Sequence, residues 1–190
     1  MDTLIKRYES LKEKVVERRA SFERLINYLE RETEWLRAPA STRFHLSRES
    51  GLLEHTCNVA EAMLKLKKAI APMISDESCV IVALLHDLGK VGMPGKPQYL
   101  EGDKYPYSFN KELTYLSVPI RSIYLALPYI ELSEEEVQAI VYHDGQYVDD
   151  NASVARNEKP LTLLLQYADT WSSFVLEKNA CQEVAVSKNS

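Results

Sequence analysis

The stretch 80-VIVALLHDLGK-90 places a histidine and an aspartate directly after an uninterrupted apolar run. From Val80 to Leu85 every side chain is apolar, so a helix here would be apolar on all sides and would lie at the centre of the molecule. His86 and Asp87 follow this run, and both are costly to bury. The carboxylate of Asp87 must therefore be paired, solvated or bound to a cation.

The helix that carries this run begins near Ser75 or Asp76, because both residue types are common N-caps, and Gly89 is a typical end. Another helix is expected before it, from after Ser47 to about Ile70. Its inward-facing stripe steps by three and four residues and consists of Leu52, His55, Val59, Met63, Leu66 and Ile70. One member of this apolar stripe, His55, is an imidazole.

The first 36 residues also repeat apolar side chains with a helical period. The stripe consists of Leu4, Tyr8, Leu11, Val15, Arg18, Phe22, Leu25, Leu29, Glu32 and Leu36. The pattern predicts one long N-terminal amphipathic helix that ends at Pro39. This helix either packs along its own domain or mediates self-association through a heptad-like spacing that Arg18 and Glu32 interrupt. From this spacing we expect a homo-oligomer.

Further helices are expected around 117–127, from Ser133, whose spacing to Glu136 fits a capping box, and over 160–177. A loop of about twenty residues, 91–110, follows the apolar helix and contains three tyrosines and a phenylalanine. Loops of this length in compact domains are commonly functional. This one could stack a base, close over a site, or simply pack on the surface. No alternating strand pattern of useful length is present, so the predicted fold class is all-α.

The composition is that of an ordinary globular domain, with 45% hydrophobic and 27% charged residues among 190. The formal net charge of -5 argues against a protein that mainly binds a nucleic-acid backbone, because such binding needs a basic face. The three cysteines lack paired metal or redox spacing, and neither a signal core nor a ~20-residue apolar span is present. We therefore expect no membrane segment and a cytoplasmic protein, or one of the host cytoplasm if it is viral.

Two imidazoles and two carboxylates could converge from three of the expected helices. They are His55, His86, Asp87 and Asp169, the last of which lies in the mostly apolar segment LLLQYADTWSS. This mixed nitrogen and oxygen set suits one divalent ion such as Mn, Fe, Co, Ni, Zn or Mg. Each residue alone also has an ordinary explanation as a bonded core histidine, a cap or an ion-pair partner. Their order, spacing and context together favour a metal site.

Three motifs in this order resemble the H…HD…D signature of the HD-domain metal-dependent phosphohydrolases: GLLEHT with His55, LLHDLGK with His86 and Asp87, and YADTW with Asp169. The chain looks most like stand-alone HD proteins of bacteria and phages, and like the HD half of certain bacterial 3′–5′ exoribonucleases. The resemblance implies an HD-domain helical bundle and one divalent metal ion held by those four residues. It also implies hydrolysis of a phosphate ester or anhydride, most often in a nucleotide, by a metal-activated water.

The resemblance covers roughly residues 41–174. We accordingly divide the chain into an N-terminal helix (1–37), an HD domain (38–178) and a C-terminal tail (179–190). The expected substrate is a nucleoside mono- or triphosphate. One alternative is a 3′–5′ exonuclease on single-stranded nucleic acid, although the chain has no β region for the OB-type module of those enzymes. The other is a catalytically inactive nucleotide-binding regulator, which the four filled ligand positions disfavour.

Other polar residues are candidates for catalysis or substrate binding. Lys90, one turn beyond His86, could contact a substrate phosphate or could be an ordinary cation at a helix end. His143, in YHDGQY, could contact phosphate or act as a general acid, or could be a charged histidine at a helix C-terminus. The predicted catalytic residues are His86, Asp87, Lys90 and His143, and the predicted substrate-binding residues are Lys90, Lys96, Tyr99, Arg121 and His143.

Overall fold

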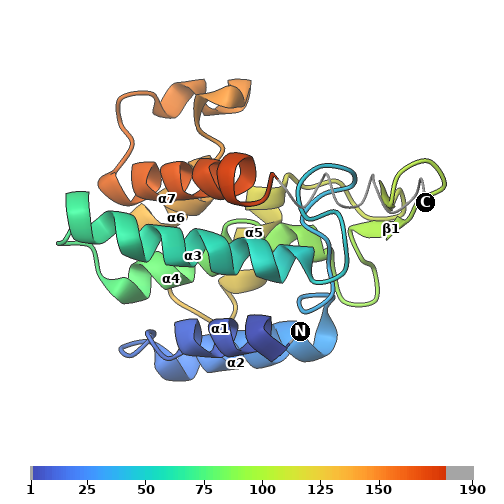
Figure 1. Ribbon diagram of the computed structural model, residues 1–190, viewed down its shortest axis with the longest axis horizontal. Helices are drawn as coiled ribbons and strands as arrows, with labels where there is room; N and C mark the ends of the chain where they lie inside the picture. The colour runs from blue at the N-terminus through green and yellow to red at the C-terminus, as the bar shows by residue number, and fades with distance from the viewer. Residues whose placement is uncertain (1, 179–190) are drawn as a thin grey trace.

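The computed structural model describes residues 2–178, apart from the side chain of Tyr147, and confirms an all-α helical bundle (Figure 1). The α-helices are α1 (Asp2–Lys12), α2 (Arg19–Glu32), α3 (Gly51–Ile70), α4 (Asp76–Leu85), α5 (Val118–Ala126), α6 (Glu134–Tyr142) and α7 (Pro160–Trp171). A π-helix (Ser172–Leu176) continues α7, and short 3-10 helices span Leu88–Val91, Gly145–Tyr147 and Asp149–Val154. None of the helices described is both long and apolar enough to cross a membrane.

Helix α4 lies at the centre of the bundle, as its apolar sequence predicts. Every residue from Cys79 to Leu85 is fully buried, and α4 contacts α3, α5, α6 and α7. The helix begins where expected, with the hydroxyl of Ser75 accepting the backbone N–H of Ser78. Its polar end, from His86 onward, is therefore within reach of side chains from several other helices.

The N-terminal segment forms two helices, α1 and α2, and not the single long helix that its period predicts. The break falls at residues 13–18. There the carboxylate of Glu77, on α4, accepts the backbone N–H groups of Val16 and Glu17. In a continuous helix these two N–H groups would bond to backbone carbonyls. Here a carboxylate that is distant in sequence accepts them, so the apolar period of the N-terminal segment could not predict the break.

The apolar stripe of α1 and α2 packs on the rest of this chain, beneath α3 and α4 in Figure 1. Its buried members are Tyr8, Leu11, Val15, Phe22, Leu25 and Leu29. Of the two uses predicted for the stripe, packing along its own domain is the one observed. The expected homo-oligomer would therefore need a different surface.

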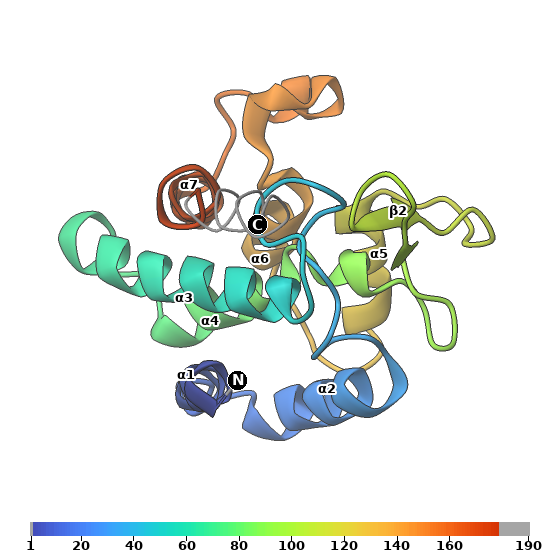
Figure 2. The same ribbon diagram turned by 45° about the vertical axis from the view of Figure 1, so that its right-hand side comes forward.

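The aromatic loop after α4 contains a small antiparallel sheet, β1 (Tyr99–Glu101) and β2 (Tyr107–Phe109), which the sequence pattern does not predict. Strands of three residues are too short to show an alternating pattern. Figure 2 shows this hairpin beside the loop that leads into α3, and the backbone N–H of Tyr107 donates to the carbonyl of Thr42 at 3.3 Å. The hairpin and the 38–50 loop thus form one edge of the molecule.

Helices α6 and α7 begin as predicted. Ser133 and Glu136 form a complete capping box at the start of α6, and Pro160 lies in the first turn of α7. The predicted C-terminal tail, 179–190, with Cys181, lies outside the described residues.

Candidate functional site

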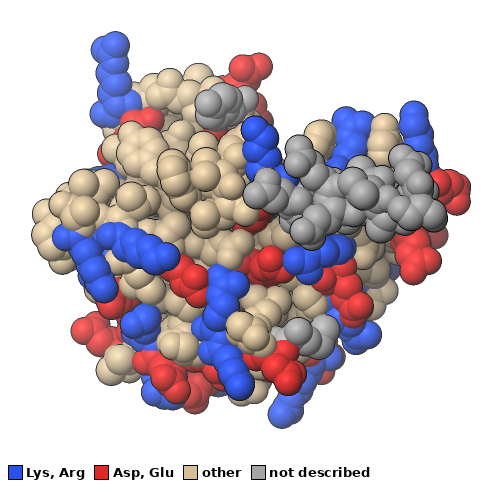
Figure 3. Space-filling view, viewed as in Figure 1, with Lys and Arg blue, Asp and Glu red and all other residues tan. Residues whose placement is uncertain are grey.

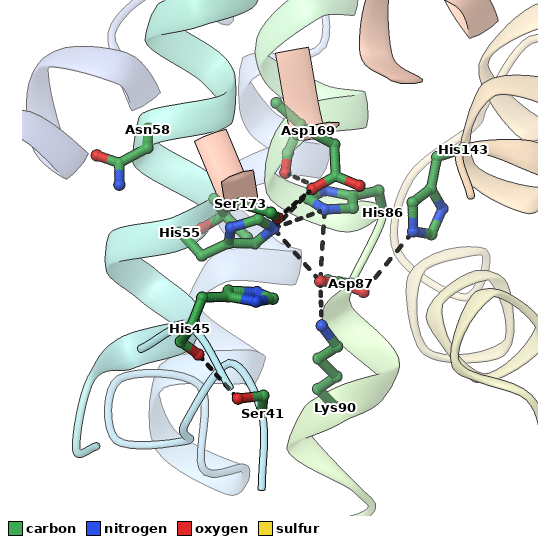
Figure 4. A network of polar contacts seen from close by, with 12 residues as sticks. Ser41, His45, His55, Asn58, His86, Asp87, Lys90, His143, Asp169 and Ser173 are labelled. Atoms are coloured by element: carbon green, nitrogen blue, oxygen red, sulfur yellow. Dashed lines mark hydrogen bonds and ion pairs between the residues drawn. The ribbon is translucent and has the colours of Figure 1, made fainter. Parts of the chain in front are cut away.

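The polar end of α4 faces polar side chains from α3, α6 and α7 (Figure 4). His55 comes from near the N-terminal end of α3, and Asp169 comes from α7. His86 is the C-cap of α4 and Asp87 follows it, while His143 is the C-cap of α6. His86 and Asp87 are adjacent in sequence, and at this helix end Nε2 of His86 still comes within 3.5 Å of Oδ2 of Asp87.

The four residues expected to bind metal lie together. Nε2 of His55 is 3.3 Å from Nε2 of His86 and 3.2 Å from Oδ1 of Asp169. Oδ2 of Asp87 lies 3.5 Å from each of the two Nε2 atoms. His55, His86 and Asp87 are almost completely buried. Ligand atoms of His55, His86 and Asp169 lie within 4.8 Å of one another, as do those of His86, Asp87 and His143.

The hydrogen bonds around this cluster fix the tautomers of both histidines. Nδ1 of His86 lies 2.7 Å from the carbonyl oxygen of Ala83, which can only accept, so this nitrogen carries the proton. Nδ1 of His55 lies 3.1 Å from both carboxylate oxygens of Glu177 and is likewise the donor. In the neutral rings both Nε2 atoms therefore present lone pairs to the two carboxylates. Four converging acceptors without a donor between them fit a bound cation.

The electrostatics of the cluster favour positive charge at the same point. Burial alone would lower the pKa of His55, but hydrogen bonds to Asp169 and Glu177 outweigh it and raise the pKa to about 10, so without a cation Nε2 holds a proton at the point where a metal ion would bind. Burial alone would raise the pKa of Asp87, but the positive charge of Lys90 and the neighbouring histidines hold it well below its usual range. The pKa of Asp169 is also lowered, because the hydrogen bond and charge of His55 overcome burial. Both carboxylates are thus ionised and available to bind a cation.

Glu177 is a functional candidate that the sequence analysis missed. Its carboxylate is buried, and it accepts a hydrogen bond from the side-chain amide of Asn58 at 2.9 Å in addition to that from His55. The π-helix supplies the reason. Its wider i→i+5 turn rotates the chain so that Glu177 and Asp169 both face His55, which a continuous 3.6-residue period would not predict.

The cluster forms one wall of a pocket of about 790 Å³. Lys90 lines it and hydrogen-bonds the carboxylate of Asp87. His143 also lines it, with Nδ1 donating to the carbonyl of Ile140 and Nε2 lying 3.8 Å from Oδ1 of Asp87. Two further cations that the sequence analysis did not single out, Arg43 and Lys178, lie in the same lining.

His45 stands at the edge of the pocket, next to His55. Their ring centroids are 5.1 Å apart, and Nε2 of His45 is buried without a hydrogen-bond partner, 4.0 Å from Oε2 of Glu177. Burial, with the positive charge of His55, lowers the pKa of His45 to about 4. His45 is therefore an uncharged polar side chain at neutral pH.

Three of the predicted substrate-binding residues lie elsewhere. Arg121 is buried, and its guanidinium donates to Gln98 Oε1 and to backbone carbonyls, including that of Thr114, so it holds the aromatic loop in place. Lys96 is exposed on a turn and does not line the metal pocket. Tyr99 lies in hollows that adjoin this pocket and share Lys90 with it.

Comparison with protein families matches the chain to the family model described as HD domain, over residues 52–172. This segment includes His55, His86, Asp87 and Asp169 and ends before Glu177. Neither the curated proteins nor the solved structures give a match.

Proposed function

This chain belongs to the HD domain family of metal-dependent phosphohydrolases, and on that premise we propose that it hydrolyses a phosphate ester or anhydride of a nucleotide. A divalent metal ion is its cofactor. The proposal concerns the substrate, a nucleoside mono- or triphosphate, and the residues that act on it.

The metal ligands we propose are His55, His86, Asp87 and Asp169. The support is the convergence of the Nε2 atoms of two imidazoles and two ionised carboxylates at one buried point. A divalent ion bound there would lower the pKa of a water molecule and offset the negative charge of a phosphate. The carboxylate of Asp87, which also faces the pocket, is the group we propose to orient the attacking water.

Lys90 is proposed to bind a phosphate oxygen. Burial alone would lower the pKa of Lys90, but the negative charge of Asp87 raises it, so the ammonium keeps its proton at neutral pH. His143 presents Nε2 to the same pocket, and in the imidazolium form this nitrogen can donate a hydrogen bond to phosphate or a proton to the leaving oxygen.

The observation that carries the proposal is the distribution of charge around the pocket. Anionic metal ligands occupy one wall, while Arg43, Lys90 and Lys178 contribute cations to the lining. A phosphate needs both a metal and cationic contacts, and a pocket of about 790 Å³ falls in the range that small-molecule ligands occupy.

A panel of nucleoside mono-, di- and triphosphates with added Mn²⁺ or Co²⁺ tests the proposal. We expect release of phosphate, pyrophosphate or triphosphate, and a loss of roughly 100-fold or more in His86→Ala, which removes an inner ligand. Lys96→Ala, exposed and outside the pocket, is the matched control and should retain activity. Identical nucleotide turnover by wild type and His86→Ala, or none by either, would refute the proposal.

A labelled single-stranded oligonucleotide in the same assay tests the exonuclease alternative. The face in Figure 3 carries lysine and arginine side chains intermixed with acidic ones, without a continuous basic surface. Together with the net charge of -5, this favours a small nucleotide over a strand.

A further inference from the structure

A second hollow, of about 540 Å³, adjoins the metal pocket and is called here the aromatic groove. It lies between residues 40–45 and the β1–β2 hairpin. The two hollows share Arg43, Phe44, His45 and Lys90 in their linings. A ligand held at the metal ligands can therefore extend into the aromatic groove without leaving the protein surface.

The wall of the aromatic groove is rich in partly exposed rings. Phe44 and Phe109 have exposed fractions of 61% and 62%, which is unusual for phenylalanine. Phe109 stands opposite Tyr99 in the hairpin, with ring centroids 5.5 Å apart, and Tyr105 and Tyr107 complete the aromatic lining. Exposed rings gathered in a concave site are typical of ligand recognition.

Positive charge is concentrated at the junction of the two hollows. The guanidinium carbon of Arg43 lies 4.8 Å from the ring centroid of Phe44 and 4.9 Å from that of Tyr105, and Arg43 donates to the hydroxyl of Tyr105 at 2.9 Å. Lys90 lines both hollows. From the metal pocket into the aromatic groove, a ligand would therefore meet first the proposed metal ligands, then the cationic side chains, then the aromatic rings.

The loop that carries Arg43 and Phe44 is held in a fixed shape. The backbone N–H of Ala40 donates to the carbonyl of Leu46, and the hydroxyl of Ser41 donates to the carbonyl of His45 at 2.8 Å. Leu46 has a φ of 44°, a left-handed conformation that a non-glycine residue adopts only when its surroundings impose it. The aromatic groove is therefore preformed, which lowers the entropic cost of binding.

We propose that the aromatic groove binds the base of a mononucleotide whose phosphate lies at the metal ligands and Lys90, an inference that rests on the proposed function. A base is joined to its phosphate through one sugar, so adjoining aromatic and cationic hollows match its two ends. Each base has a flat face that stacks on aromatic rings. Stacking of this kind does not by itself select one base, because every base has such a face.

The experiment compares a nucleoside 5′-monophosphate with ribose 5-phosphate, which lacks the base. Binding is measured by calorimetry on the metal-loaded protein, and hydrolysis is measured as kcat/KM. Wild type should prefer the nucleotide, and Phe109→Ala and Phe44→Ala should each reduce that preference about tenfold. Phe109→Trp retains a ring and should retain the preference. Tyr124→Ala, an equally exposed aromatic on α5 outside the groove, should leave the preference unchanged.

The outcomes separate this inference from the proposed function. Nucleotide hydrolysis with a preference that neither phenylalanine variant changes overturns the groove assignment alone. A ring-dependent binding preference without nucleotide hydrolysis supports the groove and overturns the proposed function. Tighter binding of a dinucleotide than of the mononucleotide, lost in the same variants, overturns the assignment to a single nucleotide. Equal binding of nucleotide and ribose 5-phosphate by wild type overturns it as well.

Discussion

Among the individual residues, Glu177 sets the orientation of the His55 ring. Its two carboxylate oxygens lie 3.1 Å from Nδ1 of His55, and its buried position excludes competing water. A carboxylate behind a metal-binding imidazole fixes the tautomer and raises the basicity of the ligand nitrogen. We therefore assign Glu177 as a positioning residue that acts through His55.

Glu177→Gln should weaken binding of Mn²⁺ by about 10- to 100-fold, because the amide loses the charge and presents only one acceptor oxygen. Isothermal titration of the metal-free protein measures the affinity directly, without dependence on turnover. Glu30→Gln is the matched control, since Glu30 on α2 pairs with Lys12 and accepts a hydrogen bond from the hydroxyl of Tyr8, both on α1. An unchanged Mn²⁺ affinity in Glu177→Gln would show that the carboxylate only supports local packing.

The sequence predicts some residues of the site and not others. His55, His86, Asp87 and Asp169 lie in short motifs whose types and order already indicate a metal site, and the structure brings them together. Glu177 is hidden because a π-turn changes the helical period just before it. Arg121 was predicted to bind substrate, but a local pattern cannot show that backbone carbonyls and Gln98 accept its hydrogen bonds.

Among the secondary-structure elements, Arg18 links the segment between α1 and α2 to α4 and α6. It donates to Glu77 on α4 and to both carboxylate oxygens of Glu136 on α6, at distances of 2.6 to 2.8 Å. The two carboxylates are nearly buried, with side-chain exposures of 9% and 2%. In the sequence, Arg18 only interrupts an apolar stripe, whereas in the fold it ties the break between α1 and α2 to the central helices.

Arg18→Met should destabilise the protein by about 3 kcal/mol near neutral pH, because it leaves two buried carboxylates without their partner. Urea unfolding measures the change. Arg19→Met removes the neighbouring cation, whose pair with Glu23 is more than half exposed, and should change the free energy of unfolding by less than about 0.5 kcal/mol. Equal effects of the two substitutions would contradict this role for Arg18.

The pH dependence of that difference follows from the same ion pairs. Burial alone would raise the pKa values of Glu77 and Glu136, but hydrogen bonds to Arg18 and to backbone N–H groups hold both below the ordinary range. A depressed carboxylate pKa stabilises the fold above the unfolded value of about 4.3 and loses that contribution as the pH falls below it. The gap between wild type and Arg18→Met should therefore narrow as the pH falls below about 4.3 and through the lowered pKa values of the folded protein.

At the level of the whole molecule, we expect metal binding to be coupled to folding, because the proposed ligands come from helices far apart in sequence. α3, the end of α4, and α7 must all be in place before the four acceptors converge. An ion that binds only the folded state stabilises it by mass action.

Addition of Mn²⁺ to the chelator-treated protein should raise the melting temperature. At 100 times the dissociation constant the stabilisation is ~2.7 kcal/mol. For a domain of this size that corresponds to roughly 5 to 10 °C, as measured by differential scanning calorimetry. His86→Ala should show little of this rise. A melting temperature that is insensitive to metal in wild type would argue against a preassembled site at these four residues.

The sequence by itself determined the all-α class, the buried helix α4, the starts of α4, α6 and α7, and the identity of the four converging residues. These features depend on local capping, apolar periodicity and short motifs, which the chain carries within a few neighbouring residues. Only the tertiary structure decided the break between α1 and α2, the burial of Arg121, the contact of Glu177 with His55 and the groove beside the metal pocket. Each of these depends on partners distant in sequence, whose hydrogen bonds and charges outweigh the local preference.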